Sequence, residues 1–233
     1  MNAPKFAVSL MCMDFAAAGQ QVATLSTMAD AFHLDIMDGH FAPNLSLSPD
    51  WVKALAPFSS IPLEAHLMTE HPDQWIEPLV AAGVHTLSPH AETLNRNAYR
   101  VMNLISSQGC RTGLVLNPMT PISQVKHLLP RVDLLTLMTV DVGFAGQPFI
   151  TEMLAKITEA AEFREQEGLN YEIQIDGSCN EKTFQRLRNA GADIFILGTS
   201  GLFSLAEELT EAWQLMSEGY QRVTGESTLV SHA

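Results

Sequence analysis

Short apolar segments alternate with longer, more polar segments along almost the whole chain of 233 residues. The apolar segments have the length and composition of buried β-strands, and the segments between them have helical periodicity or composition. The expected strands are Phe6–Met11, Ala31–Ile36, Pro62–Leu67, Val84–Ser88, Thr112–Leu116, Leu134–Thr139, Tyr171–Ile175 and Ile194–Leu197. The expected helices are Phe15–Met28, Asp50–Ala56, Pro72–Ala82, Thr93–Gln108, Pro121–Leu129, Thr151–Glu167, Asn180–Ala190 and Leu202–Ser217. Glycines stand where helices should stop, as C-terminal glycines do: Gly83, Gly109, Gly168 and Gly191.

This alternation predicts βαβ units and a parallel sheet. About eight such units in about 220 residues match a single (β/α)8 TIM barrel, in which a closed sheet is surrounded by helices. A doubly wound open sheet is the alternative, but no glycine-rich dinucleotide-binding motif follows the first strand. We expect one barrel domain over residues 1–222 and a polar, frayed C-terminal tail over residues 223–233.

The chain is acidic, because 26 Asp and Glu against 13 Lys and Arg give a formal net charge of −13. Nucleic acids and anionic membranes bind clustered cationic side chains, so neither is an expected partner. A small anionic ligand remains compatible, because backbone N–H groups can hold it. No apolar run is long enough to span a membrane, and the N-terminus does not resemble a signal peptide. The three cysteines are widely spaced and form no CxxC pair, which favours a reducing cytoplasm.

Polar side chains end three of the expected strands. His33 and Asp35 lie two residues apart on the second strand, so their side chains share one face of the sheet. His66 ends the third strand and Asp176 ends the seventh. A single histidine is usually a packed core residue, but a buried polar quartet needs compensation for its charge. The four side chains together therefore predict one divalent metal in an open, catalytic type of site, with Zn, Mn, Fe or Co as candidates.

Glycine-rich turns follow the sixth, seventh and eighth strands. In TIM barrels, loops after the last strands and a helix N-terminus often bind phosphate, although any single glycine more simply makes a tight turn. No lysine ends an expected strand, so no Schiff-base lysine is indicated, and no arginine is placed to clamp a phosphate. Backbone amides and helix dipoles would have to hold it. Four methionines at strand ends are either core residues or the wall of a dry metal site: Met11, Met37, Met68 and Met138.

The motifs resemble the ribulose-phosphate 3-epimerase family, and within it the D-allulose-6-phosphate 3-epimerases. The resemblance spans nearly the whole chain in order. It rests on Ser9-Leu10-Met11-Cys12-Met13-Asp14, His33-Leu34-Asp35-Ile36-Met37-Asp38-Gly39-His40-Phe41, Pro43-Asn44, His66-Leu67-Met68, Gly113-Leu114-Val115-Leu116-Asn117-Pro118, Met138-Thr139-Val140-Asp141, Gly143-Phe144-Ala145-Gly146-Gln147-Pro148-Phe149-Ile150, Asp176-Gly177-Ser178-Cys179 and Gly198-Thr199-Ser200-Gly201-Leu202-Phe203.

The resemblance implies a barrel of the ribulose-phosphate-binding type with one divalent metal per subunit, held by His33, Asp35, His66 and Asp176. It implies that Asp35 accepts and Asp176 donates a proton at C3, on opposite faces of the substrate, through a cis-enediolate. Ser9 and His66 are the implied contacts to the sugar. The implied phosphate contacts are Gly143, Phe144, Ala145, Gly146, Gly177, Ser178, Gly198, Thr199 and Ser200.

Substrate choice depends on one departure above all. Ribulose-phosphate enzymes usually have a second glycine where this chain has Ser178, and a six-carbon sugar needs room at these loops. We therefore expect interconversion of D-allulose 6-phosphate and D-fructose 6-phosphate, with D-ribulose 5-phosphate and D-xylulose 5-phosphate as the alternative. Two other positions depart from the family pattern. Val142 stands where the family usually has proline, and Gln174 stands where it usually has glutamate. The change at Gln174 affects the surroundings of Asp176.

Two further classes of protein remain as alternatives. One is a phosphate-binding barrel with lyase or decarboxylase activity, which the lack of a strand-end lysine disfavours. The other is a non-catalytic sugar-phosphate-binding protein, which the two intact carboxylates disfavour. The resemblance also suggests a homo-oligomer, either a dimer or a hexamer, with Phe203 and the loop Gly39–Leu47 as candidate contacts.

Overall fold

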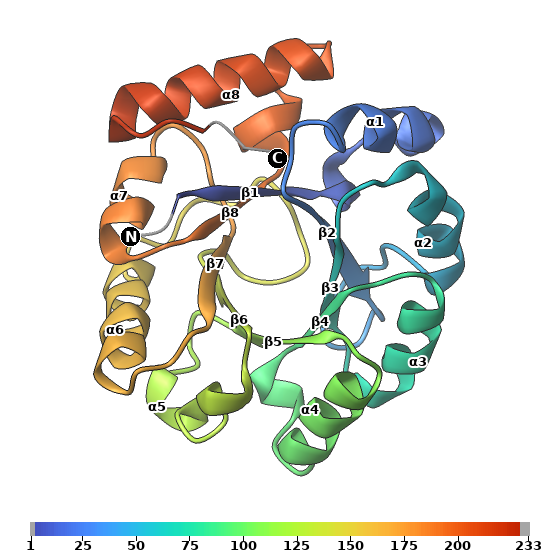
Figure 1. The fold of residues 1–233 in the computed structure, drawn as a ribbon, viewed down its shortest axis with the longest axis vertical. Coiled ribbons are helices and arrows are strands. Elements are labelled where there is room, and N and C mark those ends of the chain that lie inside the picture. The colour runs from blue at the N-terminus through green and yellow to red at the C-terminus, as the bar shows by residue number, and fades with distance from the viewer. Residues whose placement is uncertain (1–2, 229–233) are drawn as a thin grey trace.

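A closed barrel of parallel strands forms the centre of the molecule in the computed structural model, which describes residues 3–228 (Figure 1). Neighbouring strands pair in chain order, and β1 closes the barrel against β8 with Phe6 opposite Phe195. The strands are β1 (Lys5–Ser9), β2 (Ala31–Met37), β3 (Leu63–Met68), β4 (Thr86–Pro89), β5 (Arg111–Leu116), β6 (Leu134–Met138), β7 (Glu172–Asp176) and β8 (Ile194–Leu197). The predicted (β/α)8 barrel is confirmed.

Helices surround this barrel on the outside, one after each strand (Figure 1). They are α1 (Ala18–Leu25), α2 (Pro49–Leu55), α3 (Asp73–Ala81), α4 (Ala98–Ser107), α5 (Ile122–Val125), α6 (Met153–Gln166), α7 (Phe184–Ala190) and α8 (Leu209–Thr224). The predicted helix-stop glycines all have positive φ, and Gly191 after α7 has φ 111°. A Cβ at Gly191 would lie 2.6 Å from Cβ of Ala161, so this turn also requires the small residue for packing.

Three expected helices begin later than predicted, the first at Ala18, the fourth at Ala98 and the seventh at Phe184. The bounds of the last and the fifth helices were also wrong. The last helix begins at Leu209 instead of Leu202, because Thr199–Phe203 forms a separate π-type turn. That turn packs so closely on the loop after β7 that a Cβ at Gly201 would lie 2.2 Å from the carbonyl oxygen of Cys179. The fifth helix is a single turn, Ile122–Val125, and a separate 3-10 turn, Leu129–Arg131, follows it.

The C-terminal boundary also differs from expectation. Helix α8 continues to Thr224 and ends at Gly225, which has φ 75°. Val223 and Thr224, expected in the polar tail, are therefore helical, and Val223 packs against the core. Residues 229–233 of the expected tail lie outside the described range.

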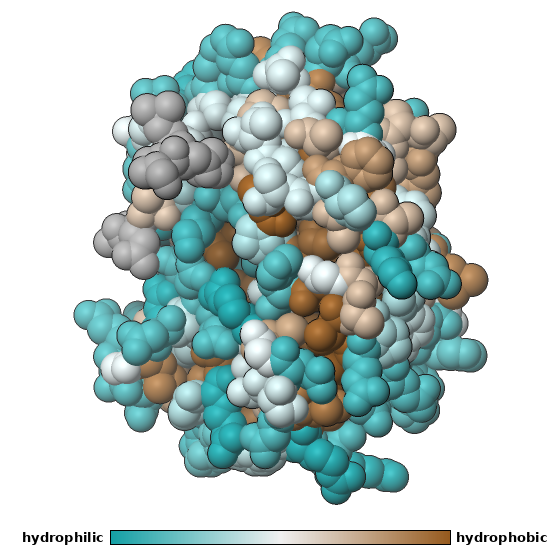
Figure 2. All heavy atoms as spheres, turned by 45° about the vertical axis from the view of Figure 1, so that its right-hand side comes forward, coloured by the Kyte–Doolittle hydropathy of each residue, from teal (hydrophilic) through white to brown (hydrophobic). Residues whose placement is uncertain are grey.

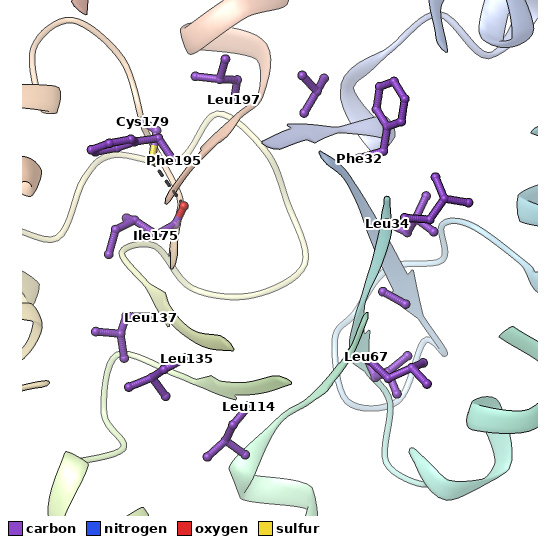
Figure 3. Close-up of a cluster of buried hydrophobic side chains, with 14 of the residues drawn as sticks. Phe32, Leu34, Leu67, Leu114, Leu135, Leu137, Ile175, Cys179, Phe195 and Leu197 are labelled. Atoms are coloured by element: carbon purple, nitrogen blue, oxygen red, sulfur yellow. Dashed lines mark hydrogen bonds between the residues drawn. The ribbon is translucent and has the colours of Figure 1, made fainter. Parts of the chain in front are cut away.

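The main hydrophobic core lies between the barrel and the helices. Figure 3 shows Leu34, Leu67, Leu114 and Leu135 pointing from their strands toward the helical layer, and all are buried. Because side chains alternate along a strand, an outward Leu34 turns its neighbours on β2 into the barrel. The barrel interior holds a smaller apolar cluster of Ala7, Ala31, Leu134, Ile194 and Ile196. Burying a leucine-sized side chain contributes about 1.5–3 kcal/mol, so the outer core fixes which strand residues face inward.

Figure 2 shows the outer surface on the side of the molecule where α1–α3 lie. This surface is mainly hydrophilic, and its apolar atoms form smaller patches. Within residues 3–228, none of the helices combines the length and the apolar character that crossing a membrane requires.

Candidate active site

Four side chains from three strands meet at the carboxyl end of the barrel, as the sequence predicted. Nε2 of His33 and Nδ1 of His66 lie 3.2 Å apart. Oδ1 of Asp35 lies 3.5 Å from Nε2 of His33 and 3.6 Å from Nδ1 of His66. Oδ2 of Asp176 lies 3.7 Å and 3.3 Å from the same two nitrogens. The inward side of β2 thus supplies two groups, and the ends of β3 and β7 supply one each.

This arrangement fits a divalent cation. In a tetrahedral site with bonds of about 2.0–2.2 Å, the ligand atoms lie about 3.3–3.6 Å from one another. The distances between the two nitrogens, and from each nitrogen to the two carboxylate oxygens, run from 3.2 to 3.7 Å, and one potential ligand atom of each side chain lies within 4.8 Å of all the others. Imidazole and carboxylate donors together suit the transition metals and zinc named above. These residues can therefore hold the predicted metal.

The histidines and carboxylates of the cluster shift one another's pKa values. Burial lowers the pKa of His66, but the hydrogen bonds and charges of Asp176 and Asp35 outweigh it and raise that pKa to about 9. Burial raises the pKa of Asp35, but the two histidines outweigh it and lower that pKa well below its usual range. Ser9 donates a hydrogen bond of 2.7 Å to Oδ2 of Asp35, which leaves Oδ1 facing the histidines. Asp35 is therefore held as a carboxylate.

A cavity opens above this cluster at the carboxyl end of the barrel. Of the predicted residues, His33 and His66 lie beneath the cavity, and the others line it: Ser9, Met11, Asp35, Met37, Met68, Met138, Gly143, Phe144, Ala145, Gly146, Asp176, Gly177, Ser178, Gly198, Thr199 and Ser200. The structure also adds Cys12, Val140, Asp141, Gln147, Cys179 and Ile196, which the sequence reasoning did not assign to the site.

The three glycine-rich loops lie against one another at one end of the cavity. Ser178 has φ 51°, an uncommon value for a residue with a side chain, and its hydroxyl donates to the carbonyl oxygen of Gln147 at 2.6 Å. The amide of Asn180 donates to the hydroxyl of Ser200 at 3.0 Å, which joins the loops after β7 and β8. No Lys or Arg lines the cavity within residues 3–228. An anion there would therefore depend on backbone N–H and hydroxyl groups.

Three polar residues near the site were missed by the sequence reasoning, the buried His90 and Lys156 and the partly buried Glu92. His90 directly follows β4, and Glu92 lies in the turn after it. Burial lowers the pKa of His90 to about 4, so its ring is neutral at neutral pH. Lys156 was assigned to a helix, but its ammonium reaches the loop after β5 and donates to the carbonyl oxygen of Asn117 at 2.6 Å. Only their side-chain contacts, which span distant segments, reveal a role.

Comparison with known proteins identifies relatives over most of the chain. Residues 5–203 match the Ribulose-phosphate 3 epimerase family. The chain is 39% identical over 198 residues to the ribulose-phosphate 3-epimerase of Bacillus subtilis, covering 84% of this chain and 91% of that protein. It is 35% identical over 194 residues to the chloroplastic ribulose-5-phosphate-3-epimerase of Arabidopsis thaliana, covering 82% and 69%. These names support ribulose phosphate, the alternative substrate, more than the expected D-allulose 6-phosphate.

Solved structures with the same architecture show the fold alone, because their sequences are distant. The 3-keto-L-gulonate-6-phosphate decarboxylase of Vibrio cholerae has a TM-score of 0.71 at 13% identity, covering 95% of this chain and 99% of that one. A 3-hexulose-6-phosphate synthase has a TM-score of 0.67 at 11% identity, covering 91% and 98%. The family match and the close sequence relatives are decisive for identity. The chain belongs to the ribulose-phosphate 3-epimerase family, whose members are isomerases.

Proposed function

We propose that this protein is a metal-dependent 3-epimerase that interconverts D-ribulose 5-phosphate and D-xylulose 5-phosphate. The observation that carries the proposal is the pair of carboxylates, Asp35 and Asp176, on the floor of one cavity and facing the same two histidines. Epimerisation needs one group to remove a proton and another to return it from the opposite side. The names of the relatives support ribulose phosphate as the substrate.

Two carboxylates in different protonation states perform the proton transfer. Asp35, held ionised by the histidines and by Ser9, takes the proton from C3 and leaves an enediolate. Asp176, in its protonated form, returns a proton to C3 from the opposite face. The stereochemistry at C3 inverts because the proton returns to the face opposite the one that it left, and Asp35 on β2 and Asp176 on β7 are proposed to act from these two faces.

A C–H bond beside a ketone is too weakly acidic for a lone carboxylate. A divalent cation held by His33, Asp35, His66 and Asp176 would supply Lewis acidity that stabilises the negative charge of the enediolate. Met37, Met68 and Met138 are buried beside the ligands, and Met11 lines the same wall half-buried. These apolar side chains exclude water, which strengthens electrostatic interactions within the site.

The phosphate would bind at the loops after β6, β7 and β8. Backbone N–H groups of Gly143–Gly146, Gly177–Ser178 and Gly198–Ser200 are the proposed donors, with the hydroxyls of Thr199 and Ser200 beside them. No cationic side chain is needed for this, because helix dipoles and oriented amides supply local positive potential. The overall acidity of the chain is thus compatible with an anionic substrate.

D-Allulose 6-phosphate is the second candidate substrate, and Ser178 is the observation that favours it. The hydroxyl of Ser178 is committed to the carbonyl oxygen of Gln147, so this residue shapes the loop beside the proposed phosphate site. A different loop shape there would accommodate one more carbon between C3 and the phosphate. The same proton-transfer chemistry would then produce D-fructose 6-phosphate.

Steady-state kinetics with both phosphates distinguish the two candidates. We expect kcat/KM for D-ribulose 5-phosphate to exceed that for D-allulose 6-phosphate in the metal-loaded enzyme. A higher value for the hexulose would transfer the assignment to the second candidate. Absence of turnover of either sugar, with the metal bound, would reject the epimerase proposal.

The assembly and compartment are part of the same proposal. We propose a cytoplasmic homo-oligomer, either a dimer or a hexamer, in which Phe203 and the loop Gly39–Leu47 contribute to subunit contacts. Free cysteines at Cys12, Cys110 and Cys179 support a reducing compartment. Light scattering of the purified protein measures the assembly directly, and a monomer would contradict it.

A further inference from the structure

A line of buried side chains continues from His66 away from the cavity. Nε2 of His66 lies 2.7 Å from Nε2 of His90. Nδ1 of His90 lies 3.1 Å from Oε2 of Glu92. Both histidine side chains are fully buried, and Glu92 is about a quarter exposed, with 24% of its side chain accessible. Three groups from β3, β4 and the turn after β4 are therefore joined end to end.

The donors and acceptors along this line can be assigned in only one way when His66 binds a cation through Nδ1. A neutral imidazole that coordinates through one nitrogen carries its proton on the other, so Nε2 of His66 is a donor. Nε2 of His90 must then accept, which leaves the proton of His90 on Nδ1. That N–H donates to Glu92, whose carboxylate can only accept. Every tautomer is thus fixed by its neighbour.

Glu92 is itself anchored by donors from the loop after β5. Its Oε1 accepts from the backbone N–H of Asn117 at 3.0 Å and from the hydroxyl of Thr120. Lys156 donates to the carbonyl oxygen of Asn117 at 2.6 Å and so fixes the loop from helix α6. The ring of Phe41 covers His90, with ring centroids 4.6 Å apart. The far end of the line is therefore held from several sides.

His33, the other histidine of the cluster, has no comparable support. Its Nδ1 is buried and has no hydrogen-bond partner within residues 3–228. Hydrogen bonds to a ligating histidine fix its ring orientation and raise its basicity. Only one of the two histidines, His66, receives that assistance from side chains in this structure.

We propose that His90 and Glu92 are positioning residues for the metal site, forming a one-directional hydrogen-bond line that holds Nδ1 of His66 toward the cation. Neither residue lines the main cavity, so neither is assigned contact with the substrate. The inference rests on the cation proposed above, and the tests below separate failure of the line from failure of that proposal.

Histidine tautomers test the line directly in the full-length, zinc-loaded protein. Long-range ¹H–¹⁵N correlation spectra of ¹⁵N-histidine-labelled protein distinguish a proton on Nδ1 from one on Nε2. We expect His66 to carry its proton on Nε2 and His90 on Nδ1, with assignments made from single histidine variants. A neutral His90 with its proton on Nε2 would overturn the proposal, whatever the activity.

Measurements of metal affinity test whether these hydrogen bonds strengthen cation binding by His66. We expect Glu92→Gln and His90→Leu to bind Co²⁺ or Zn²⁺ about 10–100-fold more weakly by chelator competition, the range for outer ligand partners. His90→Gln should recover part of that loss, because its carbonyl can accept from Nε2 of His66. Glu70→Gln is the matched control: this exposed carboxylate also lies on the rim after β3, and its variant should bind metal like the wild type.

Two further readouts keep the test decisive. The visible spectrum of the bound Co²⁺ should change in Glu92→Gln, because a reoriented His66 alters coordination, while a purely structural defect would lower only the unfolding temperature. Wild-type affinity and spectrum in a folded Glu92→Gln variant would refute the line. Failure of the wild type to bind any divalent cation would instead refute the proposed metal site. If the variants do not fold, the tautomer measurement on the zinc-loaded wild type still tests the line.

Discussion

At the residue scale, alternation along single strands was the most informative signal. Leu34 packs outward, so its neighbours His33 and Asp35 face the barrel interior, and the sequence was sufficient to predict that. The sequence was not sufficient to predict the contacts of His90, Glu92 and Lys156. Their contacts depend on how β4, the loop after β5 and α6 come together, and no local pattern encodes such contacts between distant segments.

Asp176→Asn should abolish most epimerisation while the fold persists. The amide cannot return a proton to C3, and a general acid or base contributes about 10²–10⁴-fold to rate, so we expect kcat to fall by at least about 10²-fold. Circular dichroism should remain unchanged. Asp73→Asn, an exposed carboxylate in α3, is the control and should keep wild-type kcat. Retained turnover in Asp176→Asn would exclude the two-carboxylate mechanism.

Glu92 should contribute stability that depends on pH. Burial raises its pKa, but the hydrogen bonds from His90 and Thr120 and the charge of His90 outweigh it and lower the pKa from 4.5 to about 2. A lowered pKa gives stability that is complete above pH 4.5 and disappears as the pH falls toward 2, at most about 3 kcal/mol. Urea unfolding of wild type and Glu92→Gln should therefore differ most above pH 5. A difference that stays constant down to pH 3 would contradict this origin.

At the scale of the elements, every expected strand is present, but loops and helix ends were less predictable. The central residues of these parallel strands are buried on both faces of the sheet, so a run of apolar residues in the sequence predicts them directly. The turn Thr199–Phe203 replaces the start of the last expected helix because it packs against the loop after β7, and propensity within the segment does not record that contact. The loop after β2 is similarly held by distant partners. The amide of Asn44 donates to the carbonyl oxygen of Gly143 at 2.7 Å.

Asn44→Ala should weaken substrate binding more than it slows the chemistry. The lost hydrogen bond releases Gly143 and the proposed phosphate loop, and a bond worth about 1 kcal/mol corresponds to an increase in KM of about fivefold. Asn103→Ala, on the outer side of α4, is the control. Steady-state kinetics separate the two effects, and an unchanged KM with a much lower kcat would assign Asn44 another role.

At the scale of the whole molecule, local positive potential at the loops after β6, β7 and β8 would reconcile the net charge of −13 with the proposed anionic substrate. His33, Asp35, His66 and Asp176 come from β2, β3 and β7, which lie on different sides of the barrel. A cation bound by these four side chains would therefore link the three strands. The barrel and the convergence of His33, Asp35, His66 and Asp176 could be predicted from the sequence. Substrate size could not, because the same proton transfer serves five- and six-carbon ketose phosphates.

Metal binding should therefore stabilise the entire fold. A cation at about 100 times its Kd adds about 2.7 kcal/mol, which corresponds to a rise in Tm of about 5–10 °C for a domain of this size. Scanning calorimetry with Zn²⁺ and after chelation measures the shift. The variant His33→Gln removes a ligand and should show a smaller rise; an equal rise in the variant would indicate that the metal stabilises the protein elsewhere.

The most direct measurement of the proposed chemistry is solvent exchange at C3. The metal-loaded enzyme is given D-ribulose 5-phosphate in deuterated water, and the product is examined by NMR. Removal of a proton by one carboxylate and its return by another predict D-xylulose 5-phosphate with deuterium at C3. Epimerised product that retains only the original hydrogen at C3, in fully deuterated solvent, would contradict a mechanism in which Asp176 delivers a proton exchanged with solvent.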